Sequence, residues 1–410
     1  MSEIKFQEPI NQYIKKYLNK KEIMYRLPST VPIEEFWPKL VEERKKLGTS
    51  IPLKDQAGHF FWYCLNDFLV ERIKIIDDSG TKSLIQHVKQ DIYEKVKFEA
   101  LIDEALHSSA IEGAFSTKKR TKEMVEKKSK PVNKSERMII NNYLALNYIL
   151  ENLHKPLDEE IVLSIYRILT EDTLDPEDIV EKYRNDTVIV WDYSTQNQIY
   201  EGPPHTKVQS LMDDLFSFIH TEDQLHPVIK ACIIHFYFVY IHPFFDGNGR
   251  TARAISYMYL LQKGYDFFKF FSISSVVREH KNKYYKAIKD VEDYNSDLTY
   301  FLNYYADMIA DSIISVLNKL QKEYGRIAIH SYLEQNGILL SKRQIKLLEK
   351  FIKGDKNFIL IEDYRKQYKV VYETARTDLN ELEALGFLTK FKQGKKYIYK
   401  FVALENLVLK

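Results

Sequence analysis

The sequence predicts a mainly α-helical protein that contains one small β-hairpin and ends in a segment of different character. Apolar residues recur at the spacing i, i+3, i+4 through most of the chain, as at Phe98, Leu101, Ile102 and Ala105, which is typical of helices with one buried face. Apolar residues make up 45% and charged residues 29% of the 410 positions, which suits globular cores in roughly two or three domains.

Residues 1–95 are expected to form an N-terminal helical region that packs on the next part of the chain. Helical patterning is present at 34–42 and at 60–65, and breaks are expected at 27–29 and at 77–80, where Pro, Ser, Asp and Gly gather. Nothing in this region indicates a chemical role.

The core of the protein is expected at residues 96–310. Its first helix, at about 97–113, stops at Gly113, a residue suited to a helix C-cap. Five further helices are expected at 134–152, 158–171, 206–220, 226–241 and 250–263. The segment 226–241 is apolar nearly all round, so we place it at the centre of a helical bundle, where it leads directly to His242.

Two short β-prone runs interrupt the helical pattern at about 187–201. Thr187 to Trp191 and Gln198 to Tyr200 are separated by a polar stretch, and two prolines follow the second run. This pattern predicts a β-hairpin. From these residues alone, a surface hairpin without a role is the plainer interpretation.

Bulk properties exclude several classes of protein. The net charge of +2 gives no global attraction to nucleic acid or membrane. The N-terminus lacks the apolar segment of a secretory signal, and the longest apolar run, Ala231 to Ile241, is too short to span a bilayer. Cys64 and Cys232 are expected to be buried free thiols. We therefore expect a cytoplasmic protein.

The segment from His242 to Arg253 concentrates the groups that phosphoryl or nucleotidyl transfer needs. His242 is its only side chain whose ordinary pKa suits a general base near neutral pH. Asp246 can hold Mg²⁺, which usually binds one or two carboxylates together with substrate phosphates. Gly247 and Gly249 let backbone N–H groups approach phosphate oxygens where a helix is expected to begin.

Arg250 and Arg253 complete this set. They lie three residues apart, so they share a helix face and can grip the outer phosphates with two hydrogen bonds each. A glycine pair and one arginine alone would indicate only a turn and a helix start. The whole segment predicts a phosphate-transfer site.

Residues 242–253 match the pattern HPFx(D/E)GNGRxxR of the Fic family at every defined position, so the chain resembles that family. Known members mostly transfer AMP from ATP to protein hydroxyl groups. The resemblance implies that His242 takes the proton from the target hydroxyl and that Asp246 holds Mg²⁺ at the α- and β-phosphates. It implies phosphate contacts for Gly247, Asn248, Gly249, Arg250 and Arg253.

Ser108 and Glu112 lie four residues apart, on one face of the first core helix. Ser108 to Gly113 match (S/T)xxxE(G/N), the inhibitory motif of Fic proteins, although alone this pattern would be an ordinary helix end. The resemblance implies that Glu112 pairs with Arg253 and obstructs the placement of the γ-phosphate. It also implies the class of Fic protein whose inhibitory helix precedes the core.

By the same resemblance, the hairpin is a flap over the active site. The residues that would register a target strand by strand addition are Val188, Ile189 and Val190. Tyr284 and Tyr285, which alone would be core aromatics of a helix, are implied to lie beside adenine. The Asn that some relatives have a few residues further on is Glu292 here, which leaves the selectivity for adenine open.

Residues 335–410 resemble a winged helix, with helices expected at 344–351, 361–368 and 372–385 before a basic β-hairpin. Residues 341–400 hold 15 Lys or Arg against 8 Asp or Glu, an excess that favours a nucleic-acid partner. The third helix opposes this interpretation because it carries Glu373, Asp378, Glu381 and Glu383 against Arg376. DNA binding and protein interaction both stay open.

We therefore expect a protein adenylyltransferase that transfers AMP from ATP, with Mg²⁺, to a Ser, Thr or Tyr of target proteins and of itself, restrained by Glu112. One alternative is removal of AMP, or transfer of another phosphate group, on the same scaffold. A second is a DNA-binding regulator whose core senses nucleotide. The sequence leaves the target and the oligomeric state open.

Overall fold

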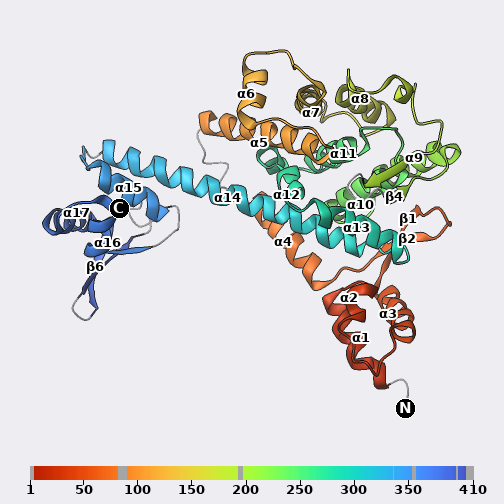
Figure 1. Cartoon of the computed structure of the whole chain (residues 1–410), viewed down its shortest axis with the longest axis horizontal. Coiled ribbons are helices and arrows are strands. Elements are labelled where there is room, and N and C mark those ends of the chain that lie inside the picture. The colour runs from red at the N-terminus through yellow and green to blue at the C-terminus, as the bar shows by residue number, and fades with distance from the viewer. Residues whose placement is uncertain are drawn as a thin grey trace. The chain divides into compact units, whose positions relative to one another are not determined.

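The structure is a computed structural model that describes residues 4–81, 90–192, 197–335, 337–352, 357–393 and 396–402. The chain divides into two compact units, residues 1–313 and 314–410. Helices make up most of each unit (Figure 1), which confirms the mainly α-helical fold class.

The first three helices form a small cluster with its own apolar core. They are α1 (Ile4–Lys16), α2 (Lys20–Met24) and α3 (Ile33–Leu47). Ile23, Phe36 and Leu40 are completely buried in this core. The break expected at 27–29 is confirmed, since it falls between α2 and α3.

The aromatic run that was expected to be helical at 60–65 is instead strand β2 (Phe60–Tyr63), which pairs antiparallel with β1 (Thr49–Lys54). The carbonyl of Trp62 accepts a hydrogen bond of 2.8 Å from the backbone N–H of Leu298, far along the chain. Aromatic residues suit a pleated surface, and distant partners decide whether such a run becomes a strand.

The break expected at 77–80 is absent, because α4 (Asp67–Thr81) continues through it. The carboxylate of Asp77 accepts a hydrogen bond of 2.7 Å from the Tyr265 hydroxyl and lies 3.0 Å from Nε2 of His226. A residue type common in turns is thus used for a tertiary contact. One glycine near a helix end costs only about 1 kcal/mol relative to alanine.

Helix α10 (Pro227–Ile241) is buried nearly all round, as expected for the centre of the bundle. The other helices of this unit are α5 (Gln90–Ile111), α6 (Lys118–Glu126), α7 (Lys134–Glu151), α8 (Glu159–Thr170), α9 (His205–His220), α11 (Asn248–Gln262), α12 (Ile273–Glu279) and α13 (Lys281–Asp293), with the short 3₁₀ segments η1 (Pro176–Asp178) and η2 (Asp266–Phe270). The predicted core helices are present, whereas α6 and α12 were not predicted. Cys64 and Cys232 are buried free thiols.

The expected hairpin consists of β3 (Ile189–Asp192) and β4 (Asn197–Glu201), which pair antiparallel with an irregularity between Val190 and Trp191. Residues 193–196 of the predicted flap lie outside the described residues. The turn of the β1–β2 hairpin lies beside β4, since Nε2 of Gln56 donates to the carbonyl of Glu201 at 3.3 Å (Figure 1).

The second unit contains three helices and a small antiparallel sheet. Helix α14 (Thr299–Gln335) precedes them, and the elements are α15 (Lys342–Ile352), β5 (Phe358–Leu360), α16 (Ile361–Tyr368), α17 (Tyr372–Ala384), β6 (Leu388–Gln393) and β7 (Lys396–Phe401), with strand order β5-β7-β6. The three helices and the β6–β7 hairpin lie where they were predicted, and β5 is an additional strand. Assignment to the winged-helix class stays a prediction.

Candidate active site between α10 and α11

His242 ends α10 in the left-handed conformation, with φ of +52°. Such a conformation is uncommon for a side chain of this size and turns the chain sharply away from the helix axis. Nδ1 lies 3.2 Å from the carbonyl oxygen of Val239. Because a carbonyl can only accept, Nδ1 carries the hydrogen and Nε2 keeps its lone pair.

The protonation state of His242 suits a base. Burial lowers its pKa to about 4, against the opposing effect of the hydrogen bond to Val239. The imidazole is therefore neutral at physiological pH, with Nε2 able to accept a proton.

The loop after His242 is held by its own side chains. Oδ1 of Asn248 accepts from the N–H of Phe244 at 3.0 Å, and its Nδ2 donates to the Phe244 carbonyl at 2.7 Å. The Phe244 ring is fully buried and stacks on Tyr166 with centroids 3.5 Å apart. The side chain of Asn248 is thus committed to the loop, which leaves its backbone N–H for a ligand.

Gly247 is required by both conformation and space. Its φ is +84°, and a Cβ at this position would lie 2.8 Å from Cγ2 of Thr170. Only glycine adopts this backbone conformation without strain. The loop can therefore approach α8 closely and present the start of α11.

Helix α11 begins at Asn248, so its first backbone N–H groups face the loop. The N–H group of Thr251 is the first to form a hydrogen bond within the helix, and it donates to the Gly247 carbonyl at 2.9 Å. Unpaired N–H groups and the helix dipole make this end a binding site for anions.

Asp246 and Arg250 form an ion pair at the same helix start. Nη2 of Arg250 lies 3.2 Å from Oδ2 of Asp246, and Nη1 donates to the Leu169 carbonyl at 3.0 Å. Arg250 is completely buried, whereas the Asp246 side chain is 42% exposed. Arg250 thus holds the carboxylate in place, and its contact with the outer phosphates stays a prediction.

The Asp246 carboxylate fits the Mg²⁺ site that the sequence predicted. Oδ1 accepts the N–H of Gly247 at 2.5 Å, and each carboxylate oxygen retains a further lone pair. Among the described residues, no group of three or more His, Cys, Asp or Glu could hold a metal. A single partly exposed carboxylate beside an anion site suits Mg²⁺ that is held jointly with phosphates.

Arg253, Glu112 and Ser108 meet as predicted. Nη2 of Arg253 lies 2.7 Å from Oε1 of Glu112 and 2.9 Å from the Ser108 carbonyl, and its Nε donates to Oγ of Ser108 at 2.9 Å. Burial would raise the pKa of Glu112, but the charge and hydrogen bond of Arg253 bring it below its usual value. Glu112 is therefore a carboxylate.

The Glu112 carboxylate lies over the first turn of α11. A Cβ built on Gly249 would collide with Oε1 of Glu112. A negative charge thus occupies the positive end of the helix, next to Arg253. This is the place that an anionic ligand would take.

Contacts outside the loop fix the end of α5 that carries Glu112. Glu104 accepts hydrogen bonds of 3.0 Å from Oγ of Ser272 and from the N–H of Ser274, at the start of α12. Nζ of Lys281 donates to the Ile111 carbonyl at 2.5 Å. These bonds join α5 to α12 and α13.

The predicted tyrosine pair is divided between core and surface. Tyr284 is 3% exposed, and its hydroxyl lies 2.9 Å from Nε2 of the buried His235. Tyr285 is partly exposed. The nearby Glu292 has no hydrogen-bond partner for Oε1 within the described part of the chain, and burial raises its pKa to about 8. Glu292 can therefore be protonated at neutral pH and donate a hydrogen bond.

The flap reaches His242 through Tyr200, whose ring centroid lies 6.4 Å from that of His242 and whose hydroxyl donates to the Tyr240 carbonyl. Val188 is buried, whereas Ile189 is 39% exposed. Within the described residues β3 pairs only with β4, so its other edge can accept a further strand.

Four residues of this site were not predicted, namely Tyr166, Thr170, Arg184 and Tyr200. Each acts by packing or by a bond to the backbone of a distant segment, and none belongs to a short motif. The sequence contains no local pattern that would identify them.

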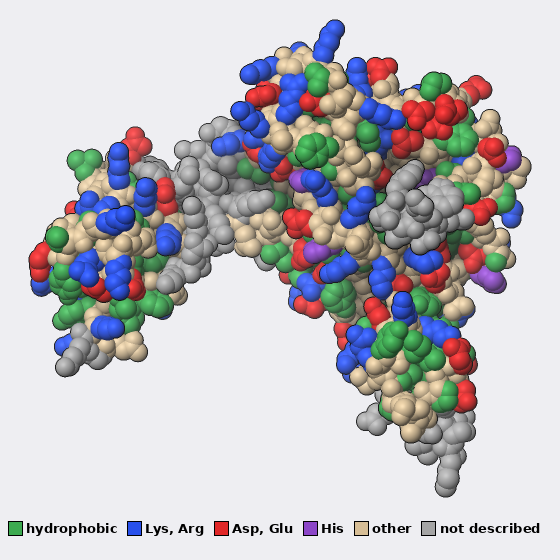
Figure 2. Space-filling view, in the orientation of Figure 1, with side chains coloured by type: hydrophobic (Ala, Val, Ile, Leu, Met, Phe, Trp, Pro, Cys, Tyr) green, Lys and Arg blue, Asp and Glu red, His purple; other side chains and the backbone are tan. Residues whose placement is uncertain are grey.

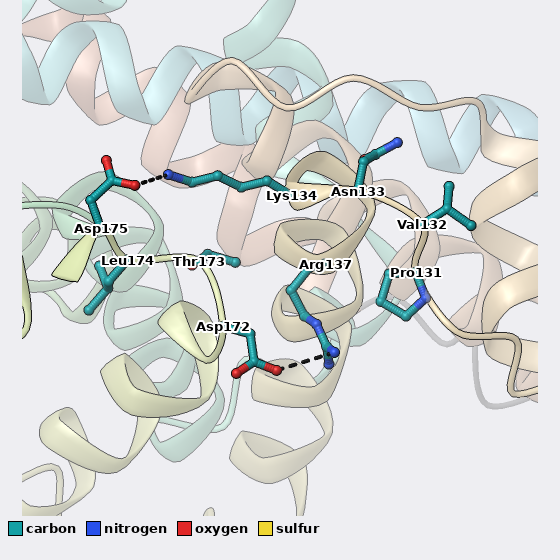
Figure 3. Close-up of a pocket in the computed structure, with 9 residues that line it drawn as sticks. All are labelled: Pro131, Val132, Asn133, Lys134, Arg137, Asp172, Thr173, Leu174 and Asp175. Atoms are coloured by element: carbon teal, nitrogen blue, oxygen red, sulfur yellow. Dashed lines mark hydrogen bonds and ion pairs between the residues drawn. The ribbon is translucent and has the colours of Figure 1, made fainter.

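A separate hollow of about 430 Å³ lies at the start of α7 (Figure 3). Its cations are neutralised locally, since Lys134 lies 3.3 Å from Asp175 and Arg137 lies 3.2 Å from Asp172. It contains none of the predicted site residues.

Comparisons with known proteins agree with this geometry. The model of the Fic/DOC family matches residues 156–260. The proteins named "Protein adenylyltransferase Fic" of Drosophila yakuba and Drosophila melanogaster are each 28% identical to the chain over 247 residues, covering 58% of it and 46% of the relative. The chain thus spans about half the length of these relatives.

The fold has a solved counterpart. A Fic family protein from Desulfovibrio desulfuricans G20 aligns with a TM-score of 0.54 at 18% identity, over 83% of this chain and 98% of that one. Within the described residues, no helix is long and apolar enough to cross a membrane.

The contact between Gly249 and Glu112 predicts a non-additive effect on stability. Gly249→Ala should lower the free energy of unfolding by about 1–3 kcal/mol, because the new methyl group collides with the carboxylate. In a Glu112→Gly background the same change should be neutral or stabilising, because alanine is favoured over glycine in a helix by about 1 kcal/mol. Denaturant unfolding of the four proteins measures both effects. An equal cost in both backgrounds would show that Glu112 does not lie against Gly249.

Proposed function

This chain is a Fic-domain protein, and from that premise we propose that it transfers AMP from ATP to a hydroxyl side chain of a protein. The observation that supports this most strongly is the placement of a neutral imidazole, His242, in the loop that leads into the anion-binding start of α11. A base for a hydroxyl and a site for phosphates are thereby joined by a rigid loop.

In the proposed reaction, the oxygen of a Ser, Thr or Tyr hydroxyl attacks the α-phosphorus of ATP. Its proton passes to Nε2 of His242, the bond from the α-phosphorus to the bridging oxygen breaks, and pyrophosphate leaves. The N–H groups at the start of α11 bind phosphate oxygens. Asp246 would hold Mg²⁺, which neutralises phosphate charge when bound.

The target would bind along the flap. The free edge of β3, which holds Ile189 and Val190 and follows Val188 directly, suits strand addition by an extended segment. The base of ATP would lie near Tyr285, with Tyr284 behind it and Glu292 available as a donor or acceptor. The protein itself is a further target in this proposal.

Glu112 restrains the reaction in this proposal. Its carboxylate competes with phosphate for the first turn of α11 and engages Arg253, which is therefore not available to the nucleotide. Because the pair is largely buried, its charge-assisted bond is stronger than a surface ion pair.

Removal of AMP or transfer of another phosphate group is the rival reaction on this scaffold. The complete GNGRxxR sequence disfavours phosphorylation, and the adenylyltransferase names of the relatives favour AMP transfer. Removal of AMP would require Glu112 to position a water molecule, so the rival depends on the same residue in a different role.

Labelling with ATP tests the proposal. With ATP labelled at the α-phosphate, Glu112→Gly should raise the rate of automodification at least about tenfold, which corresponds to an activation barrier lower by about 1.4 kcal/mol. The gain should vanish when Arg253→Ala or His242→Ala is added, because the freed arginine and the base are both needed. Label from the γ-phosphate should stay in solution.

A matched control is Glu94→Gly, a change of the same type about five helical turns earlier in α5. It should leave the labelling at the wild-type level. Protein labelled from the γ-phosphate would indicate phosphorylation instead, and a Glu112→Gly variant no faster than wild type would refute the inhibitory role.

A second candidate function, DNA binding, is favoured by the C-terminal unit. The acidity of α17 was our argument against it, but those acids are largely engaged within the unit. Asp378 accepts from the Tyr364 hydroxyl at 2.8 Å, and Glu381 accepts from Nε2 of Gln344 at 2.7 Å. Arg376 has a side chain that is 55% exposed, and it lies 3.8 Å from the exposed carboxylate of Glu373.

The hairpin next to α17 adds basic side chains. Lys392 and Lys396 are exposed, and Tyr397, the partner of Lys392 across the hairpin, is 43% exposed. Figure 2 shows Lys and Arg side chains spread over the visible face of this unit. A helix with an outward arginine and a basic hairpin together suit the groove and the backbone of a DNA duplex.

This candidate predicts salt-dependent binding of duplex DNA to the full chain. The affinity should fall steeply between about 50 and 200 mM salt, as for contacts with phosphates. Arg376→Glu and Lys392→Glu should each weaken binding by about tenfold or more at low salt. Lys46→Glu in the first unit is the control, and its binding should be unchanged. Equal loss in all three variants, or no binding at low salt, would exclude a specific DNA surface here.

A further inference from the structure

Arg184 is a buried arginine whose hydrogen bonds in the described residues all go to backbone carbonyls. It lies between η1 and β3 and is 2% exposed. Nε donates to His242 at 2.8 Å and Nη1 to Asp186 at 2.8 Å, while Nη2 donates to Pro203 and, at 3.4 Å, to Ile241. A guanidinium group whose hydrogen bonds all go to main-chain carbonyls fixes the relative position of the segments that it joins.

Two of these carbonyls belong to the C-terminus of α10. The last carbonyls of a helix have no partner inside it, and the left-handed turn at His242 leaves its own carbonyl outside the helical pattern. A cation at a helix C-terminus is favourable because the dipole is negative there. Arg184 therefore stabilises the unusual backbone from which the His242 imidazole projects.

The remaining contacts belong to the flap. Asp186 lies just before β3, and Pro203 follows β4. A Cβ on Gly202 would lie 2.9 Å from Nη2 of Arg184, so the exit of the flap packs directly on the guanidinium. The backbone N–H of Arg184 also donates to the Pro243 carbonyl at 2.9 Å. One residue thus joins the entry of the flap, its exit and the loop that carries His242.

We propose that Arg184 is a positioning residue that fixes the flap against His242, so that a hydroxyl delivered along β3 meets Nε2. The inference rests on the proposed function. It adds that target placement and the position of the base are set by one guanidinium rather than independently. Transfer should therefore depend on Arg184, whereas ATP binding should not.

The charge of Arg184 gives this role a second consequence. Burial is the main cause of the lowered pKa of His242, and the charge of Arg184 lowers it further. When the cation is removed, the pKa of His242 should rise, while burial still holds it below the ordinary histidine value of about 6.5. Nuclear magnetic resonance titration of the His242 ring measures this without any catalytic activity.

The test compares Arg184→Gln, Arg184→Lys and Gly202→Ala, each in the Glu112→Gly background. Arg184→Gln should slow single-turnover AMP transfer at least about tenfold, because misplacement of reacting groups by about 1 Å is that costly. Affinity for ATP should stay within about twofold. Arg184→Lys keeps the positive charge but loses the planar group that donates to several carbonyls. The pKa of His242 should therefore stay near that of the parent, while AMP transfer should still be slow. Gly202→Ala should also slow transfer, because its methyl group would meet both the guanidinium and Val188 of the flap, each at 2.9 Å.

Arg44→Gln is the matched control for loss of a buried arginine. Arg44 is 1% exposed and donates to the carbonyls of Tyr13 and Leu18 at 2.9 and 3.0 Å, far from the loop in its contacts. This variant should lose stability without any change in the His242 titration.

The outcomes are distinguishable. If Glu112→Gly with Arg184 intact gives no AMP labelling, the proposed function fails, and the titration alone decides the role of Arg184. The inference is overturned if Arg184→Gln leaves the titration at its parental position, if Arg44→Gln moves it equally, or if ATP affinity falls as much as transfer does.

Discussion

The positive end of α11 is the feature on which the rest of the site depends. Unpaired N–H groups in a first helical turn attract anions, and here the turn is fixed by Asn248, which bonds to both backbone groups of Phe244. Glu112 places a carboxylate on this turn, against Gly249 and Arg253. In the proposed function, a nucleotide would therefore compete with Glu112 for the same charges, so that binding and restraint would be two states of one site.

Most of the fold and the central loop were predictable because their causes are local. Helical spacing of apolar residues predicted the core helices, and the segment 226–241, which is apolar nearly all round, was correctly expected at the centre of the bundle. The segment 242–253 joins His, Asp, Gly and Arg within a few residues, so its chemistry was apparent without tertiary information. The pairing of Glu112 with Arg253 came from the resemblance to a family, and the same pair is present in the structure.

The remaining features depend on distant partners. The run 60–65 became a strand because its backbone forms hydrogen bonds with the segment before α14. The spacing of residues within the run does not predict that partner. Arg184 binds carbonyl oxygens, which every residue has, so sequence cannot select its partners. The acids of α17 counted against DNA binding in the sequence, yet Asp378 turns inward to Tyr364. Arg250 pairs with Asp246, a contact that the sequence did not predict.

The affinity for ATP of wild type and of Glu112→Gln, measured by calorimetry beside that for adenosine, tests most directly whether Glu112 competes with phosphate. Glutamine keeps the shape of the side chain and removes its charge. We expect ATP to bind the variant at least about tenfold more tightly, which corresponds to a gain of about 1.4 kcal/mol in the free energy of binding. Adenosine, which has no phosphate, should bind both proteins equally. An unchanged affinity for ATP, or an equal gain for adenosine, would contradict competition between Glu112 and phosphate.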